Sequence, residues 1–249
     1  MFKKIFIIAI LIVSNLYAKT IKVAISANVS YAINDLIKEF NRINPNIKVQ
    51  VTLGGSGKLV AQIRHNAPYH IFMSADMNYP NALYKDKIAI TKPKIYAQGA
   101  LSYFSIKQRD FSMGLDLLKD KNIRRIAVAN PKTAPYGKAT KEALENAKLY
   151  KLLKNKFVYG ESISQTVSYT ITATDIGFIA SSSLYSKSLK KYKKGINWQE
   201  VEPTLYNPIN QGIVILKNGK ENKDVKKFYN FILSDSAKEI FKRFGYIVS

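Results

Sequence analysis

A twice-repeated alternation of strand and helix patterns constrains the fold of this chain more than any other feature. Short β-rich runs, the first of them "TIKVAIS" at residues 20–26, alternate with stretches whose apolar residues recur at helical spacing, such as residues 32–43. The same succession restarts at "RRIAVAN", residues 124–130. Strands alternating with helices indicate α/β units with mostly parallel sheets and helices on both faces. We therefore expect two similar α/β lobes.

The last segment predicts how the two lobes are connected. It contains a strand pattern, "PINQGIVIL", followed by two helix patterns, and we expect it to return to the first lobe. Lobe I would then comprise residues 19–97 plus 208–249, and lobe II residues 98–207. Two chain crossings between lobes make a hinged cleft, and ligands of open α/β sheets bind at the carboxyl ends of the strands.

The first 18 residues have the layout of a secretory signal peptide. Lys3 and Lys4 precede an apolar run from Ile5 to Val13, and a small residue, Ala18, ends the segment. A single membrane anchor is the alternative, but the apolar run is shorter than the ~20 residues that a spanning helix needs. We predict cleavage after Ala18 and an exported mature chain.

Composition excludes some kinds of site and leaves one alternative open. The chain has no cysteine, which rules out disulfides and thiolate metal sites. Its formal net charge of +22 invites a nucleic-acid interpretation, yet the lysines are dispersed along the chain. We expect a solvated basic surface attracted to anions in general, and no nucleic-acid partner.

The stretch "VTLGGSGKLVAQI", residues 51–63, reads as a strand, a glycine-rich turn and a helix. A P-loop fails here because Thr52 and Leu59 occupy two of its defining positions. The nucleophile elbow fails because Lys58 stands where its last glycine should be. What remains is a helix N-terminus with free N–H groups and the hydroxyl of Ser56, which suits an anion.

Neither metal binding nor catalysis has a comparable motif. The two histidines, His65 and His70, are five residues apart, a spacing that does not place both on one helical face. No general base with a partner can be named. An exported enzyme is therefore only an alternative, as is a nucleic-acid or surface-binding protein whose case rests on charge alone.

Five stretches, in order along nearly the whole mature chain, carry a resemblance to a known family: "VAISANVSYAINDLIKEF", "GGSGKLVAQIRHNAPYHIFMSAD", "RIAVANPKTAPYGKATKEAL", "FVYGESISQTV" and "AKEIFKRFGY". They resemble the ModA family, the periplasmic molybdate-binding proteins of ABC importers. The resemblance implies a two-lobed periplasmic-binding-protein fold of type II and no enzymatic activity. It also implies a tetrahedral oxyanion held between the lobes by hydroxyls and main-chain N–H groups.

Four positions of this sequence match anion-binding positions of the family. Ser56 matches the serine of the second loop, and Asn28 stands where the first loop usually has serine. The NH₂ of an asparagine can still donate a hydrogen bond, so the resemblance implies the same role for Asn28. Tyr136 and Ile163 match positions that donate backbone N–H groups.

Two departures and several further implications accompany the resemblance. Ala180 stands where the family often has a tyrosine, with Ser181 as the nearest replacement donor, and His70 stands where an aspartate is usual. Molybdenum or tungsten would be bound only as the oxyanion, with no cofactor and no direct protein ligand to the metal. We expect a monomer in the periplasm that delivers its ligand to the permease and ATPase subunits of an ABC importer.

The identity of the anion stays open between molybdate, tungstate, sulfate and phosphate. Hydrogen phosphate carries a proton and needs an acceptor, so a site made only of donors rejects it. Sulfate is smaller than molybdate, so cavity size must separate the two. Molybdate and tungstate are too alike for the sequence to separate.

Overall fold

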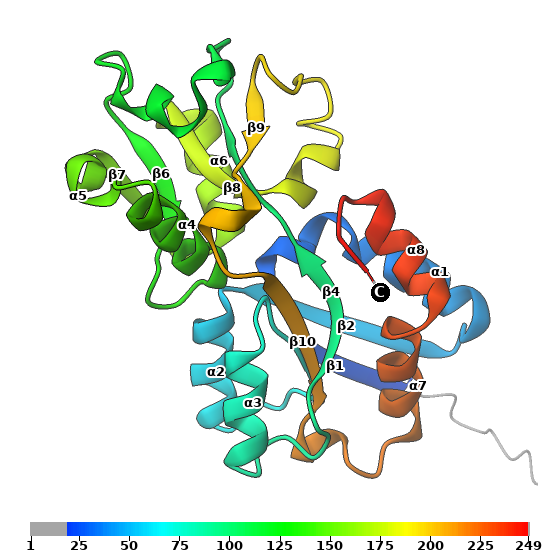
Figure 1. The fold of residues 1–249 in the computed structure, drawn as a ribbon. Helices are drawn as coiled ribbons and strands as arrows, with labels where there is room; N and C mark the ends of the chain where they lie inside the picture. The colour runs from blue at the N-terminus through cyan, green and yellow to red at the C-terminus, as the bar shows by residue number, and fades with distance from the viewer. Residues whose placement is uncertain (1–18, 249) are drawn as a thin grey trace, which may run out of the picture.

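The computed structural model describes residues 19–248, which form two five-stranded sheets with helices on both faces (Figure 1). These two mixed sheets confirm the predicted two-lobed α/β architecture. The predicted signal peptide, residues 1–18, lies outside the described residues. Within residues 19–248, no helix has both the length and the apolar character needed to cross a membrane.

The sheet of lobe I contains β1 (Lys19–Ser26), β2 (Ile47–Gly54), β3 (Ile71–Met73), β4 (Lys94–Gly99) and β10 (Ile209–Ile215). Its strand order is β2-β1-β3-β10-β4, with β1, β2 and β3 parallel and β10 antiparallel to both of its neighbours. The chain therefore returns to this sheet near its end, as the sequence predicts.

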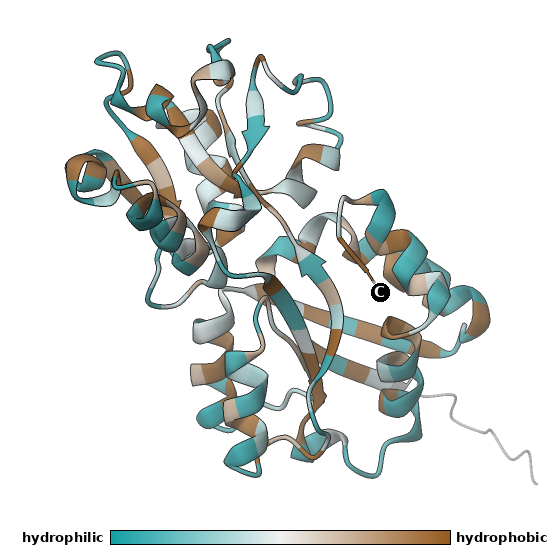
Figure 2. Cartoon of the chain, viewed as in Figure 1, coloured by the Kyte–Doolittle hydropathy of each residue, from teal (hydrophilic) through white to brown (hydrophobic). Residues whose placement is uncertain are grey.

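Helices cover both faces of this sheet because successive side chains of a strand point to opposite sides. Val23 and Ile25 of β1 pack with three helices on one face, while Ala24 packs with two helices on the other. The apolar sides of the helices face the sheet and their polar sides face outward (Figure 2). The three helices are α1 (Ile33–Ile43), α7 (Lys223–Ile232) and α8 (Asp235–Arg243), and the two are α2 (Ser56–Arg64) and α3 (Asn78–Lys85).

The sheet of lobe II contains β5 (Leu101–Phe104), β6 (Ile126–Ala129), β7 (Phe157–Gly160), β8 (Ile176–Ala180) and β9 (Trp198–Glu200). Its order, β7-β6-β8-β5-β9, repeats that of lobe I, and the fourth strand is again the antiparallel one. Its helices are α4 (Pro135–Asn146), α5 (Tyr150–Leu153) and α6 (Ile163–Thr172).

The two crossings between the sheets differ in length. One residue separates the end of β4 at Gly99 from the start of β5 at Leu101, so β4 continues past residue 97, where we had expected lobe I to end. The return crossing leads from β9 to the start of β10 at Ile209 and includes a short 3-10 turn, Pro203–Leu205. We call these two connections the hinge region.

Candidate functional site: an oxyanion cavity between the lobes

A small cavity lies between the lobes, where strands end and helices begin. The volume of the cavity is about 10 Å³, which is room for on the order of one water molecule. Ligands of α/β sheets bind at this edge because helix N-termini point there. Its lining comes from the end of β1 and the 3-10 turn Ala27–Tyr31, the end of β2 and the start of α2, the segment after β3, and the starts of α4 and α6. The lining residues are Ser26, Ala27, Asn28, Gly54, Gly55, Ser56, Ala75, Ala134, Pro135, Tyr136 and Ile163.

Two serine hydroxyls of lobe I form a pair in this cavity. The Oγ atoms of Ser26 and Ser56 are hydrogen-bonded to each other, and Ala75 N donates to both, at 3.0 and 3.1 Å. Each hydroxyl has one proton, and the contact between the two oxygens uses one of them. The other proton remains for a ligand, so the pair can supply one hydroxyl donor.

Ser26 is a site residue that our sequence reasoning missed. It is the last residue of β1 and is buried. Its position in the sequence could have identified it, because a polar residue at the carboxyl end of a central strand lies at the edge of the sheet where ligands bind.

Main-chain N–H groups at the cavity come from helix starts that have no side-chain cap or only a partial one. The residues before α2 and α4 are Gly55 and Ala134, and neither side chain accepts a hydrogen bond from its helix. At the start of α6, the Ser162 hydroxyl accepts one hydrogen bond from the helix, from Gln165 N at 3.2 Å. First-turn N–H groups have no acceptor within their own helix, so those of Tyr136 and Ile163 remain available at the positive ends of their helix dipoles.

The position of α4 depends on close packing at Gly137. A Cβ atom added there would lie 2.1 Å from the carbonyl oxygen of Ala129 at the end of β6. Only glycine allows the helix start to approach the strand this closely. Pro135 begins the helix, where its missing N–H costs no hydrogen bond. The local sequence therefore places the N–H groups of this turn at the cavity.

Asn28 lies at the cavity, but its NH₂ group has protein acceptors. Nδ2 donates to Gln211 Oε1 at 2.9 Å and to the Tyr246 hydroxyl at 3.0 Å. Its Oδ1 is buried without a hydrogen-bond partner. In this arrangement the atom left for a ligand is therefore an acceptor, whereas the family resemblance implied a donor.

Ser181 is not among the residues that line the cavity. Its hydroxyl pairs with Ser102 Oγ on β5, at 2.7 Å, within lobe II. Ala180, at the family's tyrosine position, is buried at the end of β8. The structure thus brings together Asn28, Ser56, Tyr136 and Ile163 but places Ser181 elsewhere.

The lobes are closed on each other around the cavity. Gly57 N of lobe I donates to Thr133 O of lobe II at 2.9 Å, and Ser164 Oγ donates to Ala27 O at 2.8 Å. At the rim, Lys58 Nζ lies 3.0 Å from a carboxylate oxygen of Glu161, with both side chains mostly exposed. Exposed ion pairs add little stability, so the two hydrogen bonds to main-chain carbonyl groups contribute more to the closure.

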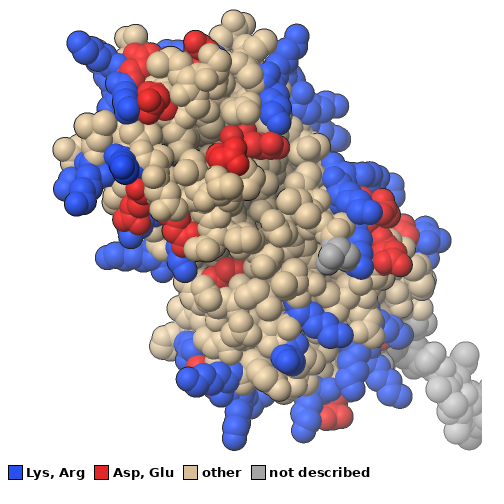
Figure 3. Space-filling view, in the orientation of Figure 1, with Lys and Arg blue, Asp and Glu red and all other residues tan. Residues whose placement is uncertain are grey.

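The cavity lining contains no charged side chain. Burial raises the pKa of the Tyr136 hydroxyl well above its ordinary value, so that hydroxyl stays neutral. On the face shown in Figure 3, Lys and Arg are spread over both lobes, with Asp and Glu among them. The positive charge is therefore a property of the surface, and the cavity itself offers neutral dipoles.

The histidines have no metal-binding partners in the part of the chain that the structure describes. Within residues 19–248, no group of three or more His, Cys, Asp or Glu side chains could hold a metal ion. Nδ1 of His70 accepts a hydrogen bond from Lys22 N at 3.0 Å, and burial lowers its pKa. This contact fixes the loop before β3, away from the anion cavity.

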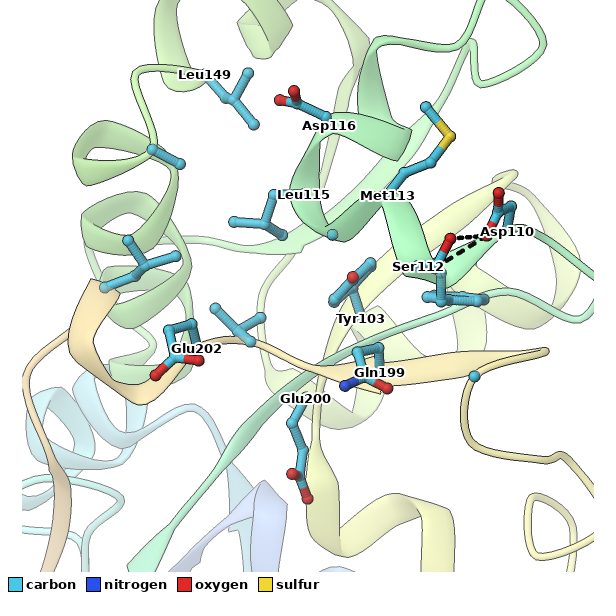
Figure 4. A pocket seen from close by; sticks show the side chains of 16 residues that line it. Tyr103, Asp110, Ser112, Met113, Leu115, Asp116, Leu149, Gln199, Glu200 and Glu202 are labelled. Atoms are coloured by element: carbon cyan, nitrogen blue, oxygen red, sulfur yellow. Dashed lines mark hydrogen bonds between the residues drawn. The ribbon is translucent and has the colours of Figure 1, made fainter.

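A larger hollow, about 580 Å³, lies within lobe II and is shown in Figure 4. Its lining includes Tyr103 and four carboxylates, Asp110, Asp116, Glu200 and Glu202. Carboxylates repel anions, so the lining of this hollow does not favour the same ligand, although Asp116 and Glu200 are paired with Lys119 and Lys194. Size alone therefore does not identify the binding site.

The two-lobed fold and the donor-lined cavity between the lobes define a binding protein of the periplasmic type. Residues 21–247 match the family described as bacterial extracellular solute-binding protein. The chain belongs to the ModA family within this group of proteins.

Two curated relatives and one solved structure carry this assignment. The molybdate-binding protein ModA of Azotobacter vinelandii is 32% identical over 231 residues, which are 92% of this chain and 90% of the relative. ModA of Rhodobacter capsulatus is 33% identical over 201 residues, 80% of this chain and 77% of the relative. The periplasmic molybdate-binding protein structure of Azotobacter vinelandii aligns with a TM-score of 0.85 at 29% identity, covering 92% of this chain and 99% of that chain.

Proposed function

We propose that this protein captures molybdate, and also tungstate, between its two lobes and delivers the anion to an ABC importer. One observation carries the proposal: uncapped helix starts from both lobes and a serine hydroxyl pair converge on a cavity without charged side chains. Neutral donors of this kind stabilise an oxyanion through hydrogen bonds and helix dipoles. The names of the relatives above support molybdate as the anion and binding, not turnover, as the activity.

Closure of the lobes is part of the proposed mechanism. Donors from Ser56 lie on lobe I, and those from Tyr136 and Ile163 lie on lobe II, so an anion between them favours the closed state by its differential affinity. Opening at the hinge region admits and releases the anion. The metal is held only through its oxygens, with no further cofactor.

The proposed cellular role follows from the same assignment. The protein acts as a monomer in the periplasm, exported by residues 1–18, and the permease and ATPase subunits of the importer receive its anion. Mass spectrometry of protein from the periplasmic fraction tests the export step, with a mature N-terminus at Lys19 as the expected result. An intact Met1 on the recovered protein would contradict it.

Thermal unfolding with a panel of oxyanions tests the ligand. A ligand at a hundred times its dissociation constant adds ~2.7 kcal/mol to the native state, and each kcal/mol raises the Tm of a chain of this size by roughly 2–4 °C. We expect molybdate and tungstate to raise the Tm by several degrees and phosphate to raise it little. Equal shifts with sulfate would refute selection by cavity size.

A further inference from the structure

The side-chain amides of Asn28 and Gln211 form a buried pair beside the anion cavity. Both residues are fully buried, and Gln211 lies on β10 next to the hinge region. In the contact described above, Asn28 Nδ2 donates to Gln211 Oε1, which leaves Asn28 Oδ1 without a partner. A buried oxygen without a hydrogen-bond partner destabilises the folded state. This orientation of Asn28 therefore keeps that cost until a donor reaches Oδ1.

The neighbours of Gln211 permit the opposite orientation as well. Tyr96 OH donates to Gln211 Oε1 at 2.8 Å and also lies 3.2 Å from Ser74 O, while Gln211 Nε2 donates to Tyr136 OH at 3.3 Å. Hydroxyls both donate and accept. If Tyr96 OH turns to Ser74 O, it can accept from Nε2, and Tyr136 OH can donate to Oε1.

Turning both amides over changes the chemistry of the cavity while its shape stays the same. Asn28 Oδ1 then accepts from Gln211 Nε2, and the NH₂ of Asn28 faces the ligand. Tyr246 OH, which donates to the main-chain oxygen of Asn28 at 2.9 Å, can turn its one proton to Oδ1 instead, because Ser182 Oγ also donates to that main-chain oxygen, at 3.2 Å. Burial raises the pKa of Tyr96, Tyr136 and Tyr246, so these hydroxyls stay neutral and serve either orientation.

We propose that Gln211 is a specificity-determining residue, which sets through Asn28 whether the cavity presents an acceptor or a donor. This inference rests on the oxyanion function proposed above. Hydrogen phosphate has a proton to donate and suits Oδ1, whereas molybdate has none and suits the NH₂. Molybdate selects the turned orientation, and the equilibrium between the two orientations contributes to discrimination between the anions.

NMR of the full mature protein can detect the orientation of the Asn28 side-chain amide directly. Without ligand, we expect NOEs between the Asn28 NH₂ protons and the ring of Tyr246, because Nδ2 lies 3.0 Å from that hydroxyl. With saturating molybdate these NOEs should disappear, since the NH₂ then faces the anion. NOEs that persist with molybdate bound would overturn the inference.

Two substitutions of Gln211 test its effect on specificity. In Gln211→Glu, a carboxylate surrounded by donors stays ionised at pH 8 and only accepts, which holds Asn28 Oδ1 toward the cavity. Molybdate and hydrogen phosphate are both dianions there, so the added charge penalises them alike and cancels in the ratio of their affinities. We expect the molybdate-to-phosphate affinity ratio to fall about tenfold or more.

Gln211→Met is the matched control, since it has similar size and directs neither amide orientation. It should lower the ratio far less than Gln211→Glu. Equal losses for both anions in Gln211→Glu would mean that charge alone acts, which overturns the inference. If that variant does not fold or binds neither anion, the NMR result decides alone. A wild-type protein that binds neither anion would instead refute the proposed function.

Discussion

The two lobes have the same strand order but line the proposed site with different kinds of group. In the proposed site, lobe I would act mainly through the side chains of Ser26, Asn28 and Ser56, whereas lobe II would act through the main-chain N–H groups of Tyr136 and Ile163. A side-chain donor disappears with one substitution. A main-chain donor persists through most substitutions and is lost only when the helix start moves or proline removes the N–H. The lobes should therefore respond differently to mutation.

The largest expected effect comes from separating the lobes. A Cβ at Gly55 would lie 2.7 Å from Glu161 O across the cleft, so Gly55→Ala should prevent closure. Without the lobe II donors, molybdate affinity should fall at least about a hundredfold. Small-angle scattering should show that molybdate no longer decreases the radius of gyration.

Gly54→Ala is the matched control for this experiment. Its Cβ would meet only the side chain of Leu59, at 3.3 Å, within lobe I. Normal closure in Gly55→Ala would show that the lobes do not need to approach as closely as they do here.

Next in size is the loss of the hydroxyl donor of lobe I. Ser56→Ala removes a hydrogen bond to a charged ligand, which costs ~1.5–3 kcal/mol, or roughly ten- to a hundredfold in affinity by calorimetry. Because Ser26 and Ser56 act as a pair, the double variant Ser26→Ala/Ser56→Ala should lose little more than Ser56→Ala alone. Fully additive losses would mean that each serine donates independently.

A main-chain donor of lobe II can be removed by proline. Ile163 is the first residue of α6, a position that favours proline, and Ser162 before it is already extended. Ile163→Pro should weaken molybdate binding roughly tenfold or more. Ile163→Ala keeps the N–H and should change affinity only a few fold. Similar losses in both variants would assign the role to the side chain and remove the contrast between the lobes.

The smallest effect is expected at the rim. Lys58 and Glu161 connect the lobes by an exposed ion pair, worth about 0–1 kcal/mol. Lys58→Ala should weaken molybdate binding only a few fold, and less at higher salt because exposed charges are screened. Calorimetry at two salt concentrations checks this. Loss of binding in this variant would instead indicate a charge-based phosphate cradle.

The fold was largely predictable because its signals are local. Apolar spacing over residues 32–43 located α1, and the run at residues 124–130 gave β6 of lobe II. Strand β9 was missed, since it has only three residues and lies at the edge of its sheet. An edge strand is defined by its pairing with β5, which no local pattern reports.

The candidate site was predictable only in part. Ser56 could be placed because a glycine-rich turn before a helix is recognisable in the sequence. Ser181 was expected as a donor because it is near the family's tyrosine position, but its partner Ser102 lies on another strand. Ser26 was missed because its role depends on Ser56 and Ala75, which reach it only through the pairing of β1 with β2 and β3.

The sequence by itself determined the two α/β lobes, the helix starts that suit an anion and the absence of thiolate chemistry, because periodicity, turn residues and composition act over short distances. Only the tertiary structure decided which atoms of Asn28 remain for a ligand. Its partners, Gln211 and Tyr246, are 183 and 218 positions away along the chain. Hydrogen-bond direction in a buried network depends on every neighbour at once, and those neighbours meet only after the chain has folded.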